Sequence, residues 1–208
     1  MGKPTMVPMI SSLLKPAVTR LINPVARLAV AAGLTPNAIT IMGACGVVGS
    51  AAWFYPQEEF FWGTLAIVFF ALSDLFDGAM ARISQTGASR WGGFLDSTID
   101  RITDSAITIA VIIPLIAKND PLSYIGLLTL VSGFLIPYIR AKAESFGIDC
   151  SVGIAERTER LIIMLTAIGF HGLGVPYVLA GGLWLLAVLG IVTVMQRIKV
   201  VRHGLALK

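Results

Sequence analysis

The chain has 208 residues, of which 56% are hydrophobic and only 13% are charged, and its mean hydropathy of +0.82 lies far above that of soluble domains. This composition excludes a water-soluble core, because too few polar residues remain to cover one. The net charge of +4 would suggest nucleic-acid binding in a soluble protein, but in a membrane protein the positions of the basic residues matter more than their sum. We therefore predict an all-α integral membrane protein that forms a single domain over residues 1–208 and has no nucleic-acid partner.

The first predicted element is an amphipathic helix over residues 10–33, next to the membrane. Basic side chains occur there among hydrophobic positions at helical spacing, which are Val18, Leu21, Val25 and Leu28. Such a helix is typical of the membrane interface, and Pro24 is expected to kink it. Thr35 and Pro36 then supply an N-cap followed by proline at the first helical position, which together predict a helix start.

Six membrane-spanning helices follow in the prediction, because several apolar stretches approach or exceed the roughly 20 residues that a bilayer requires. Their predicted ranges are 36–55, 61–83, 91–117, 121–146, 155–171 and 174–198. Together they would form a six-helix bundle over residues 36–198, with outer turns at Pro56, Pro121 and residues 172–176.

The distribution of lysine and arginine predicts which way this bundle is inserted. Basic residues precede the first helix, follow the last one, and lie between the second and third and between the fourth and fifth. Only Lys118 falls on the opposite side. Because positively charged segments stay on the cytoplasmic side, both termini are expected to be cytoplasmic.

Five aspartates stand within the second and third predicted helices, although a charge at a helix centre costs roughly 2.5–3.5 kcal/mol even on lenient insertion scales. They are Asp74, Asp77, Asp96, Asp100 and Asp104. Spacings of three and four residues place the first two on one helix face and the next two on one face of the following helix. Because a short turn makes the two helices antiparallel neighbours, all four carboxylates could meet. Divalent cations would balance them most simply, and oxygen ligands favour Mg²⁺, Mn²⁺ or Ca²⁺.

Salt bridges within the membrane are the alternative explanation for these aspartates. Arg82 and Arg101 are the two nearby bases that could form them. For Asp104, pairing with Arg101 or a position outside the ligand shell of a metal is favoured over direct metal ligation.

The two aspartate segments resemble the signature of the CDP-alcohol phosphotransferase family, D-x2-D-G-x2-A-R-x8-G-x3-D-x3-D. The chain reads Asp74-Leu75-Phe76-Asp77-Gly78-Ala79-Met80-Ala81-Arg82 and then Gly92-Gly93-Phe94-Leu95-Asp96-Ser97-Thr98-Ile99-Asp100. All eight signature residues are present, with nine residues instead of eight between Arg82 and Gly92. The extra residue lies in the turn, so the spacing within each helix is unaffected. The six-helix layout and the amphipathic N-terminal helix also resemble the family, over most of the chain.

This resemblance implies an enzyme that transfers a phosphatidyl group from CDP-diacylglycerol to an alcohol and releases CMP. It also implies a homodimer in the bacterial plasma membrane, with the active site facing the cytoplasm. Two divalent cations, Mg²⁺ or Mn²⁺, would be held by Asp74, Asp77, Asp96 and Asp100, and Asp100 would also act as the general base. The nucleotide would be bound by Asp74, Asp77, Gly78, Ala81 and Arg82. Asn37 and Thr40 are further nucleotide candidates, for which simple helix capping is the alternative.

Basic residues near the cytoplasmic ends of the last three predicted helices are candidates for binding a phosphate on the acceptor alcohol. They are Arg140, Lys142, Arg157, Arg160 and Arg197. Arginines at a helix start suit a doubly charged phosphate, because the helix dipole and free amides already favour an anion there. The segments around these residues resemble the family members whose acceptor is myo-inositol 1-phosphate, which would give phosphatidylinositol phosphate as product.

Three alternatives stay open at this point. Glycerol 3-phosphate is a second acceptor that needs a phosphate pocket. The basic residues are also explained by the positive-inside bias and its attraction to anionic lipid. A divalent-cation transporter is the hypothesis from another class, in which the intramembrane carboxylates would line a permeation path.

Overall fold

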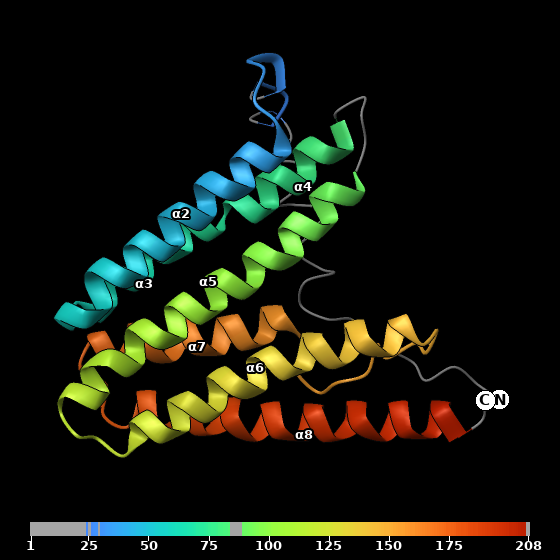
Figure 1. Ribbon diagram of the computed structural model, residues 1–208. Helices are drawn as coiled ribbons and strands as arrows, with labels where there is room; N and C mark the ends of the chain where they lie inside the picture. Colours follow the sequence, from blue (N-terminus) through green and yellow to red (C-terminus); the bar gives the residue numbers. More distant parts are fainter. Residues whose placement is uncertain (1–23, 25, 29, 84–88, 207–208) are drawn as a thin grey trace. The chain divides into compact units, whose positions relative to one another are not determined.

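The computed structural model describes residues 24, 26–28, 30–83 and 89–206, with the backbone alone for positions 75, 77, 78, 81 and 82. Every regular element in these residues is a helix (Figure 1). The helices are α2 (Pro36–Phe54), α3 (Phe60–Ala71), α4 (Ser73–Ile83), α5 (Arg90–Ala117), α6 (Leu122–Ser145), α7 (Arg157–Gly172) and α8 (Val178–Ala206), with the 3-10 turn η1 (Tyr55–Gln57) after α2. The prediction of an all-helical fold is confirmed for the described residues.

Most of the predicted helices begin and end close to the predicted residues. The last one begins at Val178 and continues to Ala206, eight residues beyond the predicted end. The prediction of one helix over residues 61–83 is wrong, because the helix breaks at Leu72 between α3 and α4. Ser73 and Asp74 follow the break, and both residue types favour a helix start, where free backbone N–H groups attract oxygen atoms.

Three helical segments within the described part of the chain are long and apolar enough to cross a membrane, at residues 36–57, 122–145 and 178–206. α3 is a shorter apolar helix. Large hydrophobic side chains are exposed along these helices; Trp53, Trp62 and Trp184 are each more than half exposed. A lipid environment accounts for this exposure, because acyl chains are as apolar as the side chains they touch. The protein is therefore a multi-pass membrane protein.

The predicted amphipathic helix over residues 10–33 lies mostly outside the described residues. Of its described part, Ala26 is fully buried, whereas Leu28 is 71% exposed. Ala26 packs with Ala79 and Met80 of α4 in a small apolar cluster.

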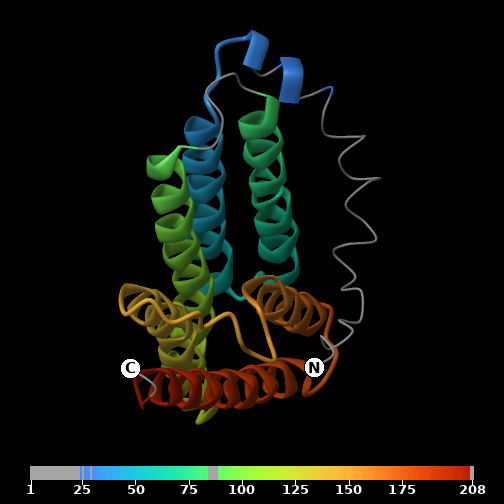
Figure 2. The same cartoon turned by 90° about the vertical axis from the view of Figure 1, so that its right-hand side faces the viewer.

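The chain divides into two compact units, residues 1–45 with 70–99 and residues 46–69 with 100–208. In the first unit, α2 and the start of α4 approach closely at Gly43, where a Cβ would overlap the side chain of Ser73. In the second unit, α6 and α8 lie side by side and α7 packs on α8 (Figures 1 and 2). Small residues permit this packing: a Cβ at Gly190 of α8 would overlap Ser132 of α6, and one at Gly182 would overlap Ala167 of α7.

Candidate active site

Three of the four predicted metal carboxylates have described side chains. Asp74 lies in the first turn of α4 and is partly buried, whereas Asp96 on α5 is exposed. Asp100, four residues further along α5, has a side chain that is only 15% exposed. Among the side chains that the structure describes, no three carboxylate, imidazole or thiol groups form a metal cluster. The predicted ligand set also needs Asp77, whose side chain lies outside the described ones, so it stays a prediction.

Both oxygen atoms of Asp100 are in ion pairs with arginines. Nη1 of Arg157, at the start of α7, lies 2.9 Å from Oδ1 of Asp100. Nη2 of Arg101, the next residue on α5, lies 3.4 Å from Oδ2. The side chains of both arginines are about three-quarters buried. Asp100 thus lies between two cationic groups, and a salt bridge with Arg101, the alternative considered for these aspartates, is present for this one.

Asp104 pairs with Arg157 of α7, whereas the sequence suggested a pair with Arg101. Nε of Arg157 lies 3.4 Å from Oδ1 of Asp104, within ion-pair distance but without hydrogen-bond alignment. One guanidinium group therefore contacts two carboxylates that stand one helical turn apart on α5. The sequence did not predict this bridge, because Arg101 was the only ion-pair partner expected for Asp104.

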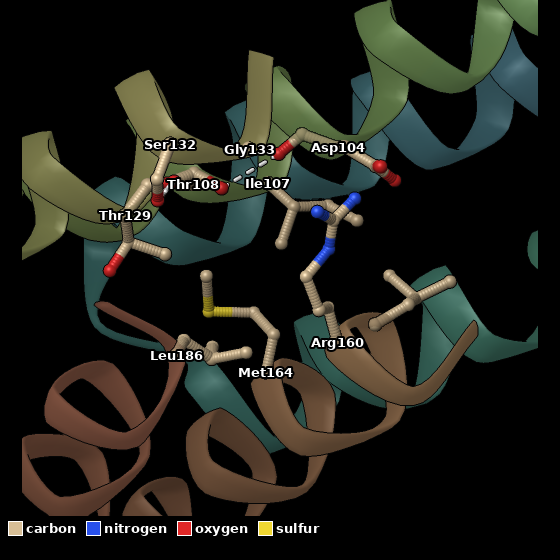
Figure 3. A pocket seen from close by; sticks show the side chains of 10 residues that line it. Asp104, Ile107, Thr108, Thr129, Ser132, Gly133, Arg160, Met164 and Leu186 are labelled. Carbon is tan, nitrogen blue, oxygen red and sulfur yellow. Dashed lines mark hydrogen bonds between the residues drawn. The ribbon is translucent and has the colours of Figure 1, made fainter. Parts of the chain in front are cut away.

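Arg160 lies one turn after Arg157 and lines a pocket between α5, α6, α7 and α8. The pocket is bounded by Asp104, Ile107, Thr108, Thr129, Ser132, Gly133, Arg160, Leu161, Met164 and Leu186. Figure 3 shows the guanidinium group of Arg160 reaching from α7 toward Asp104 of α5. Within the described residues, Nη1 of Arg160 is buried without a hydrogen-bond partner. A buried cationic donor of this kind has strong capacity to bind an anion or a hydroxyl oxygen.

The α7 N-terminus itself is less available to an anion than the sequence suggested. Glu156 and Glu159 form a capping box, in which each side chain accepts a hydrogen bond from the other residue's backbone N–H. These carboxylates occupy two of the amides that were expected to attract a phosphate. The side chains of Arg157 and Arg160 consequently remain as the cationic groups of this helix end.

Arg197 of α8 has a structural role that local sequence did not reveal. It is 8% exposed, and its Nε donates to the carbonyl oxygen of Val152 over 2.9 Å. Its Nη1 donates to the carbonyl oxygen of Ile136 on α6. These bonds join α6, the segment before α7 and α8, and they occupy part of the guanidinium group.

The other two predicted acceptor residues are exposed and have local partners. Arg140 pairs with Glu144 one turn further along α6, with Nε 2.9 Å from Oε1. Nζ of Lys142 lies 4.9 Å from the centre of the Phe146 ring. Of the five predicted basic residues, Arg157 and Arg160 are therefore the two that share the helix end beside Asp100 and Asp104.

The nucleotide candidates on α2 have mixed outcomes. Thr35 accepts a hydrogen bond from the backbone N–H of Ala38, so the predicted N-cap is confirmed. The hydroxyl of Thr40 donates to the carbonyl oxygen of Pro36 over 3.1 Å, which is a contact within the helix. Asn37 lies beside the signature glycine of α5, because a Cβ at Gly92 would stand 3.3 Å from Oδ1 of Asn37. The remaining candidates, Gly78, Ala81 and Arg82, lie on α4, and their side chains are outside the described ones.

The chain is similar to enzymes of known activity. A phosphatidylinositol phosphate synthase of Streptomyces avermitilis is 43% identical over 195 residues, which cover 89% of this chain and 79% of that protein. The synthase of Mycobacterium tuberculosis is 39% identical and is matched over 91% of this chain and 89% of its own. A crystal structure of the mycobacterial synthase with CDP-DAG bound has a TM-score of 0.82, covering 88% of this chain and 94% of that chain at 39% identity.

A second crystal structure of the mycobacterial synthase, in complex with manganese and citrate, also has a TM-score of 0.82. It covers 86% of this chain and 88% of that chain at 38% identity. The sequence model of the CDP-alcohol phosphatidyltransferases matches residues 33–201, which include both aspartate segments and all five basic candidates. This protein belongs to the CDP-alcohol phosphatidyltransferase family.

Proposed function

We propose that the protein transfers the phosphatidyl group of CDP-diacylglycerol to myo-inositol 1-phosphate, giving phosphatidylinositol phosphate and CMP. The observation that supports an acceptor carrying a phosphate is the position of Arg157, whose guanidinium lies 2.9 Å from the carboxylate of Asp100. A phosphate held by Arg157 and Arg160 would bring its attached alcohol next to that carboxylate. The names of the relatives agree with this acceptor, because they are phosphatidylinositol phosphate synthases.

Two divalent cations, Mg²⁺ or Mn²⁺, are part of the proposal. Their proposed ligands are Asp74, Asp77, Asp96 and Asp100. The donor set fits hard cations, because it contains only carboxylate oxygens and no histidine or cysteine. The manganese complex of the mycobacterial synthase supports the same class of metal. When bound, the cations would neutralise the pyrophosphate of the donor and stabilise the charge that develops during displacement.

The donor's nucleotide would be bound by residues of α2 and α4. Gly78 and Ala81 have no bulky side chain, so the nucleotide can approach the backbone of α4, and Arg82 would contact its phosphates. Asn37 lies beside Gly92, the glycine that opens the second half of the signature, which favours a role for Asn37 at this site. For Thr40 the bond from its hydroxyl to the Pro36 carbonyl favours a structural role within α2 instead.

Asp100 would remove the proton from the acceptor hydroxyl. A carboxylate bound to a metal is ordinarily a poor base, so this role requires that one of its oxygens faces the hydroxyl. The acceptor's phosphate would be held by Arg157 and Arg160, with Arg140, Lys142 and Arg197 as further contributors. Of these three, Arg197 has the weakest support, because the bonds to Val152 and Ile136 already occupy it.

The membrane arrangement completes the proposal. Residues 1–208 would form one domain with six spanning helices, α3 and α4 together making the second, and an amphipathic N-terminal helix in the interface. The protein would be a homodimer in the bacterial plasma membrane, with both termini and the active site on the cytoplasmic side. The one-sided distribution of basic residues supports this orientation.

One assay tests the acceptor directly. Purified protein would be given CDP-diacylglycerol and Mg²⁺ with inositol 1-phosphate, inositol, glycerol 3-phosphate or serine in separate reactions, and CMP release would be measured. We expect turnover with inositol 1-phosphate and little with inositol. Preferred use of glycerol 3-phosphate would instead select the second candidate. The transporter hypothesis loses its basis, since the family assignment explains the intramembrane carboxylates.

A further inference from the structure

The Arg157 guanidinium group stands between two carboxylates that have different positions in the site. Its Nη1 contacts Asp100 at 2.9 Å, and its Nε contacts Asp104 at 3.4 Å. Asp100 belongs to the signature, whereas Asp104 lies one turn beyond it and has no role in the proposed chemistry. Asp104 is 29% exposed, and its Oδ1 is buried without a hydrogen bond in the described residues. An intramembrane carboxylate of this kind is expected to have a function.

We propose that Asp104 is a positioning residue, which holds Arg157 so that this arginine can leave Asp100 when a divalent cation binds there. The inference rests on the proposed function only in taking Asp100 to be a metal carboxylate. A cation on Asp100 competes with Arg157 for Oδ1, because both are positive and both need the same oxygen. Asp104 offers the displaced guanidinium a second carboxylate, so that it keeps a negative group within ion-pair distance in a low-dielectric site.

The geometry supports exchange between these two carboxylates over complete departure of the arginine. Arg157 already lies within ion-pair distance of both, so a small rotation of the side chain would shift its ion pair from Asp100 to Asp104. Arg101, which also pairs with Asp100 at 3.4 Å, forms no ion pair with Asp104 among the described side chains that would serve as a second anchor. A guanidinium group presents five donors in a fixed plane, so Arg157 bound to Asp104 would keep donors for the acceptor's phosphate.

This exchange links the two substrates. Metal binding on Asp100 would release the donors of Arg157, and an anion on Arg157 would in turn favour metal binding, since coupling between two sites is reciprocal. The acceptor's phosphate would therefore bind best when the metal site is filled.

Metal affinity in the absence of both substrates tests the role of Asp104. Mn²⁺ binding to the purified full-length protein would be measured by electron paramagnetic resonance for wild type, Asp104→Asn, Arg157→Gln and the double variant. In Asp104→Asn, Arg157 loses its second anchor and competes more strongly for Asp100, so Mn²⁺ should bind at least about fivefold more weakly, the lower end of typical coupling between sites. In Arg157→Gln, the competitor is gone and Mn²⁺ should bind more tightly.

The double variant decides between mechanisms. If Asp104 acts through Arg157, the double variant should bind Mn²⁺ with the same affinity as Arg157→Gln alone. If Asp104 instead binds the metal or acts by its charge alone, the double variant would bind Mn²⁺ more weakly than Arg157→Gln, by the same factor that separates Asp104→Asn from wild type. That result would overturn the proposal. Equal Mn²⁺ affinity in wild type and Asp104→Asn would also overturn it. Arg202→Gln, an exposed site on α8, is the matched control for loss of one positive charge and should bind Mn²⁺ as wild type does.

Asp100→Asn separates this inference from the proposed function. Mn²⁺ affinity that does not change in Asp100→Asn would remove Asp100 from the metal site and overturn the inference. Failure of the enzyme to use inositol 1-phosphate, combined with the expected double-variant result, would support the inference and reject only the acceptor. Elution as a single species in size-exclusion chromatography would confirm that each variant is folded.

Discussion

The guanidinium group of Arg197 donates from Nε to the carbonyl oxygen of Val152, which lies 45 residues earlier in the chain and 2.9 Å away. The same side chain bonds the carbonyl oxygen of Ile136. Cys150 lies in the same segment and is fully buried. The segment before α7 is thus attached to α6 and α8 by an arginine that the sequence placed only at the acceptor site.

Replacing Arg197 by alanine should therefore lower stability as well as activity. Each hydrogen bond to a charged group contributes about 1.5–3 kcal/mol, and the two carbonyl oxygens would lose their partner. We expect a lower melting temperature in detergent. We also expect lower turnover whether the concentration of CDP-diacylglycerol or that of inositol 1-phosphate is varied. A normal melting temperature with weakened use of inositol 1-phosphate alone would show instead that Arg197 acts mainly on the acceptor.

Replacing Arg160 by alanine should affect the acceptor selectively. Loss of one charge-assisted hydrogen bond of about 1.5–3 kcal/mol corresponds to roughly a 10- to 150-fold lower kcat/KM for inositol 1-phosphate. The KM for CDP-diacylglycerol should change much less, and Arg160→Lys should restore only part of the loss, because an ammonium group lacks the planar fork. Arg202→Ala is the control for charge. Wild-type kinetics in Arg160→Ala would leave only the positive-inside bias as the explanation of this residue.

Asp100→Asn should abolish CMP release while CDP-diacylglycerol still binds, since three of the four proposed metal carboxylates remain. Asp77→Ala should weaken both metal and donor binding. Donor binding can be measured by equilibrium titration, separately from turnover. Full turnover by Asp100→Asn would exclude Asp100 as the base.

Two glycines of α2 give a matched test of the close approach in the first unit. A Cβ at Gly43 would overlap Ser73 and stand 3.1 Å from the carbonyl oxygen of Phe70, whereas a Cβ at Gly49 meets nothing within 4 Å. Gly43→Ala should destabilise the protein, because backbone and side chain must shift to admit the methyl group. Gly49→Ala should be neutral or stabilise it by up to about 1 kcal/mol through helix propensity. Melting temperatures in detergent compare the two; equal values would show that the approach at Gly43 is easily relaxed.

The proposed orientation is tested by cysteine labelling in intact cells, in a background that lacks Cys45 and Cys150. Glu59→Cys, in the 56–60 turn, should react with an impermeant reagent, and Ser151→Cys should not. Both positions are exposed, so access to the reagent depends on the side of the membrane. Labelling at position 151 would reverse the proposed topology.

Local features of the sequence determined most of the helices and the family of the protein. Runs of apolar residues predicted the helices, because a segment in lipid must satisfy its own backbone hydrogen bonds. The Thr35 cap predicted the start of α2, since capping involves residues three apart. The spacing of the aspartates predicted a carboxylate site and the family, because helical spacing places such residues on one face whatever the rest of the chain does.

Contacts between distant segments were decided only by the tertiary structure. Asp104 pairs with Arg157, 53 positions later in the chain, and not with its neighbour Arg101. Charge pairing has a long range and little angular preference, so spacing cannot select one arginine among several. The bonds of Arg197 to carbonyl oxygens of two other segments leave no local pattern, because any residue supplies a carbonyl. The break at Leu72 likewise interrupts a run that is apolar and helical in composition, at the place where Ser73 packs on Gly43.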